Sequence, residues 1–263
     1  GYVGTGIGAA ISGLRPIVDV ATASFLFQPF SQVVNEAANI HYMTGGQTRV
    51  PMVIHVNHGI RGGGAAQHSH SPQAMLWNTP GIKVMLPSSA RDVRGLLRTA
   101  VEDDNPVFWA DHVKLFDYLD EAPDAEERIP FGVAEVKRAG TDVTIVGTSL
   151  MVRRALEAAE VLAADGISAE VIDPRTLVPF DTDAILASVG RTGRLVVVDE
   201  CHQSCGVGAA IVARVAEHAF DSLRAPIRRV ATADVPIPFG RPMEAFVEPT
   251  AAKVVDAVRS LLG

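Results

Sequence analysis

Residues 62–72 hold the densest group of side chains in this sequence that could transfer protons. Three consecutive glycines, Gly62 to Gly64, precede an amide, two imidazoles and two hydroxyls: Gln67, His68, Ser69, His70 and Ser71. Glycine adopts backbone conformations closed to other residues and lets a ligand approach the main chain. Histidine changes charge near neutral pH and therefore suits proton transfer. The same composition also fits a polar surface loop, so the surrounding sequence has to decide between the two.

The segments around this stretch predict a sheet of parallel strands. Residues 50–56 and 83–86 have the apolar character of strands, and a short helix is expected between them at 73–77. Ser88 or Ser89 can cap a helix with apolar residues spaced three and four apart, and 106–109 is a further strand. Strands that alternate with helices form a parallel sheet covered on both faces, and its ligands bind beyond the carboxyl ends of the strands. Residues 62–72 are expected at that edge.

The first forty residues predict a helix, a strand and a second helix. Residues 4–10 have the glycine spacing of a dinucleotide-binding turn, but no strand precedes them in this sequence, so we interpret them as a small-residue helix. Residues 15–20 predict a strand buried on both faces. Residues 28–42 have helix-like apolar spacing and predict a helix that ends at a glycine pair.

The chain changes in character after its first hundred residues. Residues 111–130 contain seven acidic residues and two prolines with little apolar periodicity, which predicts a solvated connection rather than a metal site. Strands and helices then alternate again up to a last helix that Thr250 can cap. We therefore expect an α/β protein of two doubly wound domains, 1–120 and 139–263, joined by a linker at 121–138.

Composition excludes several function classes. A length of 263 residues with 48% hydrophobic residues allows two ordinary domains with buried cores. A net charge of −7 argues against nucleic acid or an anionic membrane as the main partner, and no apolar run is long enough to span a bilayer. The two cysteines, Cys201 and Cys205, indicate no disulfide framework and fit a cytoplasmic protein.

Motifs along nearly the whole chain resemble one family. Residues 65–71 read Ala-Ala-Gln-His-Ser-His-Ser and are followed by Pro-Gly-Ile-Lys-Val at 80–84. Further matches are Gly-Leu-Arg-Pro at 13–16, Asn-Glu-Ala-Ala at 35–38, Asp-Asp-Asn-Pro at 103–106, Asp-Pro-Arg-Thr-Leu at 173–177 and Ala-Asp-Val-Pro at 233–236. Together they resemble the beta subunit of thiamine-diphosphate-dependent 2-oxoacid and acetoin dehydrogenases, within the transketolase fold family.

The resemblance assigns roles to particular residues. His68 matches the active-site histidine that bonds the substrate carboxylate or intermediate and assists acyl transfer to a lipoyl group. Phe25 matches an aromatic residue that lies against the aminopyrimidine ring of thiamine diphosphate, and Gln67 is expected to contact the cofactor. His70 stands where relatives often have glutamine. His55 and His58 either line the pocket or are structural histidines.

The resemblance also implies groups that this sequence does not supply. The glutamate that activates the cofactor should precede Gly1, so we expect an N-terminal segment to be missing. The family holds magnesium with a Gly-Asp-Gly motif that is absent here, which implies that an alpha subunit carries Mg²⁺ and most of the cofactor in a heterotetramer of two alpha and two beta chains. Asp103 and Asn105 match a stretch that binds a structural potassium ion in relatives. A lipoyl acyltransferase is a further expected partner, although Arg224 stands where several relatives use an acid to hold it.

Other interpretations stay open at this stage. The Cys201–Cys205 stretch contains two thiols and an imidazole, fewer ligands than a structural zinc site requires. The chain could instead be the C-terminal half of a single-chain transketolase or deoxyxylulose-phosphate synthase. It could also be a catalytically silent scaffold subunit, if the activating glutamate is absent from the complete polypeptide.

Overall fold

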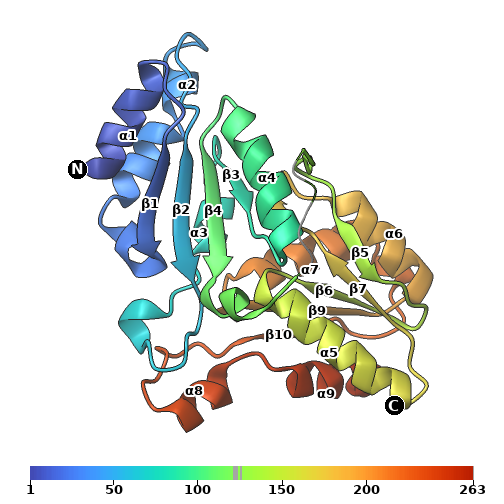
Figure 1. The fold of residues 1–263 in the computed structure, drawn as a ribbon. Coiled ribbons are helices and arrows are strands. Elements are labelled where there is room, and N and C mark those ends of the chain that lie inside the picture. Colours follow the sequence, from blue (N-terminus) through green and yellow to red (C-terminus); the bar gives the residue numbers. More distant parts are fainter. Residues whose placement is uncertain (121–123, 125, 263) are drawn as a thin grey trace.

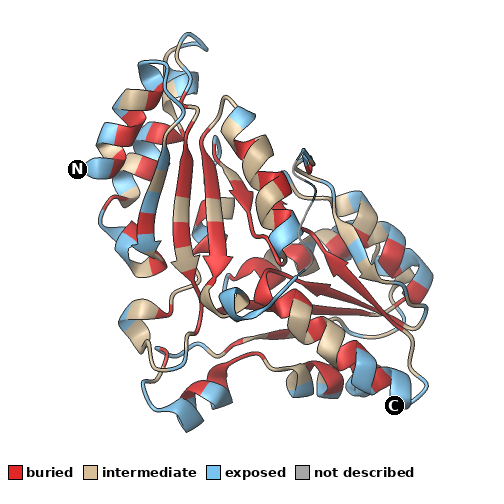
Figure 2. Cartoon of the chain, viewed as in Figure 1, coloured by how far each residue is buried: buried red, intermediate tan, exposed pale blue. Residues whose placement is uncertain are grey.

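The computed structural model describes residues 1–120, 124 and 126–262. Within them the chain forms two α/β units, each built on a five-stranded sheet (Figure 1). Buried residues concentrate in the two sheets and on the helix faces that cover them (Figure 2). The predicted fold class is therefore confirmed.

The first sheet has the strand order β1–β2–β4–β3–β8. Four of its strands are parallel: β1 (Ile17–Thr22), β2 (Val53–His58), β4 (Val107–His112) and β3 (Lys83–Met85). The fifth, β8 (Thr176–Val178), comes from the second half of the chain and runs antiparallel to β3. The sequence prediction of a purely parallel sheet missed this strand, because three residues are too few to show an alternation pattern. β8 thus joins the second half of the chain to the first sheet.

The N-terminal helix packs closely on the sheet. α1 (Tyr2–Ile11) ends just before Gly13, whose φ is +99°. A Cβ atom on Gly6 would lie 2.6 Å from Cγ2 of Val18 in β1. Glycine at position 6 therefore allows the close approach of helix and strand, which confirms the small-residue helix and not a dinucleotide-binding turn.

Two expectations for the N-terminal part are wrong. The strand predicted at 15–20 is the edge strand β1, with Ile17 51% exposed, because it has a neighbour on one side only. The helix predicted over 28–42 is interrupted: a π-helical segment at Gln32–Ala37 is followed by α2 (Ile40–Met43). Apolar spacing predicts which residues face the core, but it does not distinguish an α-helical turn from the wider turn of a π-helix.

The remaining elements of the first unit follow the predicted order. α3 (Gln73–Trp77) and α4 (Ala90–Glu102) lie between the strands, and the Ser89 hydroxyl accepts a hydrogen bond from Asp92 N at the start of α4. Short 3₁₀ turns, η1 (Ala23–Phe27), η3 (Ala66–His68) and η4 (Val113–Asp117), follow β1, β2 and β4. They extend the carboxyl ends of the strands, which point toward the second unit (Figure 1).

The second sheet has the strand order β10–β9–β6–β7–β5. Its strands are β5 (Glu135–Arg138), β6 (Val143–Gly147), β7 (Ala169–Asp173), β9 (Leu195–His202) and β10 (Arg228–Thr232), and β5 is antiparallel to β7. Its helices are α5 (Leu150–Ala164), α6 (Thr182–Thr192), α7 (Val207–His218), α8 (Arg241–Val247) and α9 (Ala251–Leu262). β5 and α8 were not predicted from the sequence.

A buried ionic cluster connects the two units. Ser88, at the start of α4, donates a hydrogen bond to Asp173 at the end of β7 over 2.5 Å. Arg175 Nε donates to Asp92 over 2.8 Å, and Lys137 lies 3.3 Å from the same carboxylate. Burial and the neighbouring Asp92 charge raise the pKa of Asp173 to about 7. The Asp-Pro-Arg-Thr-Leu motif therefore links the two units.

The acidic stretch is less solvated than predicted. Asp111 is buried in β4, where Trp109 Nε1 donates a hydrogen bond to it over 2.6 Å. Glu127 forms an ion pair with Arg91, and Asp120 forms one with Arg153. Of the predicted linker at 121–138, residues 121–123 and 125 lie outside the described residues, and its last four residues form β5. Among the helices of the described chain, none combines the length and apolar character required to cross a membrane.

Candidate active site

Residues 59–72, which we call the histidine loop, follow directly after β2. Gly59, Gly62 and Gly63 have φ angles of +96°, +81° and +103°, a region that favours glycine. Gly59 N donates a hydrogen bond to the carbonyl oxygen of His70 over 3.1 Å and so closes the base of the loop. Glycine is therefore required at these three positions, because the loop can return to the end of β2 only with these positive φ angles.

His68 and Phe25 lie together at the carboxyl ends of β1 and β2. Their ring centroids are 5.8 Å apart with perpendicular planes. The Phe25 side chain is 44% exposed, and His68 is half-buried. His68 Nδ1 is buried and has no hydrogen-bond partner within the described part of the chain. The structure thus presents an exposed aromatic ring next to an imidazole nitrogen that can bind a group from outside the chain.

His70 and Gln67 face a cleft between the two units. The cleft has a volume of about 780 Å³, and its polar wall is formed by Gln67, Ser69, His70, His202, Ser204 and Asp234. Nδ1 of His70 lies 2.9 Å from the Ser24 hydroxyl, and its ring packs edge-on against Phe27 at 5.1 Å. Burial, reinforced by the nearby His202, lowers the pKa of His70. A neutral His70 is therefore held in place by η1, while Gln67 is exposed.

Two carboxylates from the second unit bind the start of the histidine loop. Gly62 N and Gly63 N each donate a hydrogen bond to Glu244 of α8 over 2.8 Å. Ile60 N donates to Glu200 of β9, and His112 Nε2 lies 2.6 Å from the other oxygen of Glu200. Successive N–H groups at positive φ form an anion-binding concavity. That property of the glycine run is the one signal in the sequence that could have indicated a carboxylate partner.

His58 and His55 differ in their surroundings. His58 is buried, and desolvation together with the nearby His112 lowers its pKa to about 3. His55 is partly buried, but hydrogen bonds and charges from Asp111 and Asp19 outweigh that burial and raise its pKa. His55 also packs against Trp109 at a centroid distance of 4.2 Å. We interpret both as structural histidines, since His55 lies between Asp19 and Asp111 and His58 between Ser71 and Ser149.

Asp103 and Asn105 lie just before the amino end of β4, at the end of the strand opposite to the candidate site. Asn105 donates two hydrogen bonds to Asp103 Oδ1, over 2.9 and 2.8 Å, and the Lys83 ammonium binds the other oxygen. Arg15 Nη1 donates to the carbonyl oxygens of Val101 and Asp103 over 3.0 and 2.8 Å. The side chains expected to bind potassium are therefore engaged within the chain, and an ion here would depend on backbone carbonyls.

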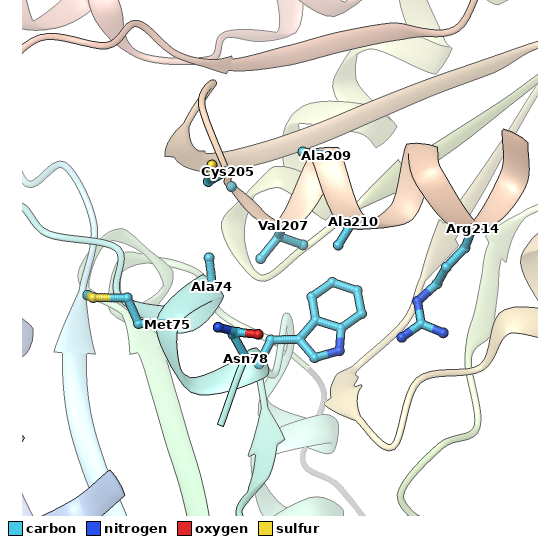
Figure 3. A pocket seen from close by; sticks show the side chains of 10 residues that line it. Ala74, Met75, Asn78, Cys205, Val207, Ala209, Ala210 and Arg214 are labelled. Atoms are coloured by element: carbon cyan, nitrogen blue, oxygen red, sulfur yellow. The ribbon is translucent and has the colours of Figure 1, made fainter. Parts of the chain in front are cut away.

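A second cavity lies between α3 and α7 (Figure 3). Its volume is about 520 Å³, and its lining includes Met75, Trp77, Cys205, Val207 and Arg214. It contains none of the residues singled out for chemistry except the exposed Cys205. Cys201 is buried, and among the described residues no group of three or more His, Cys, Asp or Glu side chains could hold a metal ion. We therefore place the candidate site at Phe25 and His68.

Comparison with known proteins identifies the family of both units. Residues 1–115 match the transketolase pyrimidine binding domain, and residues 132–254 match the transketolase C-terminal domain. The pyruvate dehydrogenase E1 component subunit beta of Rickettsia felis is 45% identical over 261 residues, which are 99% of this chain and 80% of the relative. This chain belongs to the family of E1 beta subunits. The resemblance described from the sequence motifs is confirmed.

Other relatives of this chain differ in the activities that their names describe. The acetoin:2,6-dichlorophenolindophenol oxidoreductase subunit beta of Bacillus subtilis is 40% identical over 263 residues, 100% of this chain and 77% of the relative. A solved structure described as a split gene transketolase, inactive beta4 tetramer, superposes with a TM-score of 0.81 at 28% identity. That match covers 98% of this chain and 79% of the solved one. Fold and family are shared more widely than substrate.

Proposed function

We propose that this E1 beta subunit supplies the pyrimidine-binding half of a thiamine diphosphate site in a 2-oxoacid or acetoin dehydrogenase. The observation that carries the proposal is the pairing of Phe25 with His68 at the carboxyl ends of β1 and β2. An exposed phenyl ring fits the flat pyrimidine heterocycle by stacking or edge contact. The unpartnered, buried Nδ1 of His68 fits a polar group brought by a ligand.

Each residue of this chain has a distinct role in that proposal. Phe25 packs against the pyrimidine ring, and Gln67 contacts the cofactor from the tip of the loop. His68 binds the substrate carboxylate or the intermediate and assists acyl transfer to a lipoyl group. When bound, thiamine diphosphate supplies the carbon nucleophile that attacks the substrate carbonyl. The histidine loop contributes by orienting His68 and by excluding water from one side of the site.

The proposal requires an alpha subunit. Magnesium prefers octahedral oxygen ligands, and the sequence contains no Gly-Asp-Gly motif to provide them. We therefore assign Mg²⁺ and the diphosphate to an alpha chain in a heterotetramer. A lipoyl acyltransferase partner, a potassium ion near Asp103, a cytoplasmic location and a division into 1–120, 121–138 and 139–263 remain predictions.

Calorimetry of thiamine diphosphate binding in the presence of Mg²⁺ tests the shared site. We expect binding by the chain together with its alpha partner and none by the chain alone. Dye reduction driven by a 2-oxoacid or acetoin should fall by at least about a hundredfold in His68→Ala, a loss typical of removing an acid–base group. Tight binding by the chain alone would disprove the shared site. Failure to bind even with the partner would favour a silent scaffold subunit.

The structural match to a split gene transketolase supports a second candidate function. In it this chain would be the C-terminal half of a transketolase-type enzyme that acts on sugar phosphates. The alpha–beta complex would then transfer a two-carbon unit between sugar phosphates and would not reduce the dye with 2-oxoacids or acetoin. The higher identity to E1 beta subunits, 45% against 28%, favours the dehydrogenase.

A further inference from the structure

The start of the histidine loop is bound to the second unit through its backbone. Three amide groups, those of Ile60, Gly62 and Gly63, donate to two buried carboxylates. Glu200 is 4% exposed and Glu244 is 3% exposed. A buried carboxylate is stable only when hydrogen bonds replace its water, so these contacts are strong constraints on the loop backbone.

Glu244 makes the more specific of the two contacts. Its two oxygens accept one hydrogen bond each from consecutive amides, both over 2.8 Å. This bidentate arrangement fixes the orientation of both peptide groups as well as their position. Gly62 and Gly63 at positive φ turn both N–H groups in the same direction, which residues with side chains rarely do.

A small hydrophobic cluster, separate from the main cores, lies beside this contact. Ile60 of the loop packs there with Ile237, which precedes α8, and with Val247, the last residue of α8. On α8 itself, Met243 is 64% exposed and Phe246 is 80% exposed. The start of the loop is therefore held to α8 by this small cluster and by the hydrogen bonds to Glu244.

We propose that Glu244 is a positioning residue for catalysis: it holds the start of the histidine loop and thereby sets the place of His68. The inference rests on the proposed function, because it assigns Glu244 an effect that acts through His68. Glu244 belongs to the other unit and lies 182 residues after Gly62 in the sequence. Its hydrogen bonds therefore couple the orientation of the active-site loop to the C-terminal domain.

Hydrogen exchange of the isolated chain tests the structural half of the proposal. In Glu244→Gln one acceptor becomes an NH₂ group that faces a backbone donor, so loop amides at 60–70 should exchange at least about tenfold faster. Glu248→Gln is the matched control, because Glu248 is also a buried carboxylate of this segment but binds Lys114, 2.8 Å away. Unchanged loop exchange in Glu244→Gln, or equal acceleration in both variants, would overturn the proposal.

A double-mutant cycle in the alpha–beta complex tests the catalytic half. Glu244→Gln should lower kcat about tenfold and leave thiamine diphosphate binding within about twofold, whereas in a His68→Ala background it should change kcat less than about twofold. Losses that multiply in the double variant would show that Glu244 does not act through His68. Glu244→Asp, which withdraws the carboxylate by one methylene, gives a second variant with the same expected pattern if Glu244→Gln folds poorly.

The two experiments separate this inference from the proposed function. If the wild-type complex binds no thiamine diphosphate, the proposed function fails and the catalytic role of Glu244 fails with it. The exchange experiment still decides whether Glu244 holds the loop, because it needs neither cofactor nor partner.

Discussion

Replacing His58 should flatten the dependence of stability on pH. His58 is 1% exposed and lies 5.1 Å from the His112 ring, between Ser71 and Ser149. Desolvation, the nearby His112 and Arg61 lower its pKa to about 3, although Glu200 acts in the opposite direction. In the unfolded chain its pKa returns to the ordinary value of 6.5. Below pH 6.5 the unfolded state therefore binds a proton that the native state does not, and the native state loses stability as the pH falls.

The size of the effect follows from the separation of the two pKa values. The loss is about 1.4 kcal/mol for each pH unit below 6.5 until the native group itself titrates near 3. Between pH 7 and pH 5, wild type should lose about 2 kcal/mol more unfolding free energy than His58→Asn. The cost of the smaller side chain is the same at both pH values and cancels in this comparison.

Urea unfolding at pH 7 and pH 5, followed by circular dichroism, measures this difference. His218→Asn is the control, since the His218 side chain is 56% exposed and its removal also deletes one imidazole. That variant should follow the wild-type pH dependence closely. The reasoning is refuted if His58→Asn loses as much stability as wild type between the two pH values, because His58 would then be protonated in the folded protein.

Three further predictions concern the domain contacts and the cofactor. Glu200→Gln should cost about 2–3 kcal/mol of unfolding free energy at pH 7, because one buried donor, Ile60 N or His112 Nε2, loses its charged acceptor; urea unfolding measures it. The native state keeps the Asp173 proton up to about pH 7, while the unfolded chain releases it near 3.8. Wild type therefore loses stability as the pH rises through this window, and the cost of Asp173→Asn should shrink by about 2 kcal/mol between pH 5 and pH 7 in the same assay. Phe25→Ala should weaken thiamine diphosphate binding by the alpha–beta complex about threefold to tenfold by calorimetry, and Phe27→Ala should change it less than about twofold.

Most of the fold could be predicted from the sequence because its core strands and long helices carry strong patterns. The helix at 90–102 and its Ser89 cap follow directly from apolar spacing and cap chemistry. β8 could not be predicted, since its three residues join a sheet formed by the other half of the chain. The exposure of β1 was also beyond reach, because apolar composition does not show which strand of a sheet lies at the edge.

The candidate site was predictable in its residue types but not in its supports. A glycine run followed by histidines after a strand predicts a loop at the carboxyl edge of the sheet, and His68 lies there beside Phe25. Glu200 and Glu244 lie more than 130 residues further along the sequence, as the separations of 140 and 182 residues in their hydrogen bonds show. No local pattern marks either residue as a partner of the loop, because the contact arises from the docking of two units.

The glycine run itself shows why local patterns mislead about ligands. Glycines at positive φ predict an anion-binding concavity, and in an enzyme that uses a diphosphate cofactor the phosphate is the obvious occupant. In this structure the concavity at Gly62 and Gly63 is filled by the carboxylate of Glu244 from the chain itself. A phosphate group could enter only by displacing a buried carboxylate and leaving it without partners, at a cost of several kcal/mol. The glycines therefore serve to attach the loop to the C-terminal domain, which fits the proposal that an alpha chain binds the diphosphate.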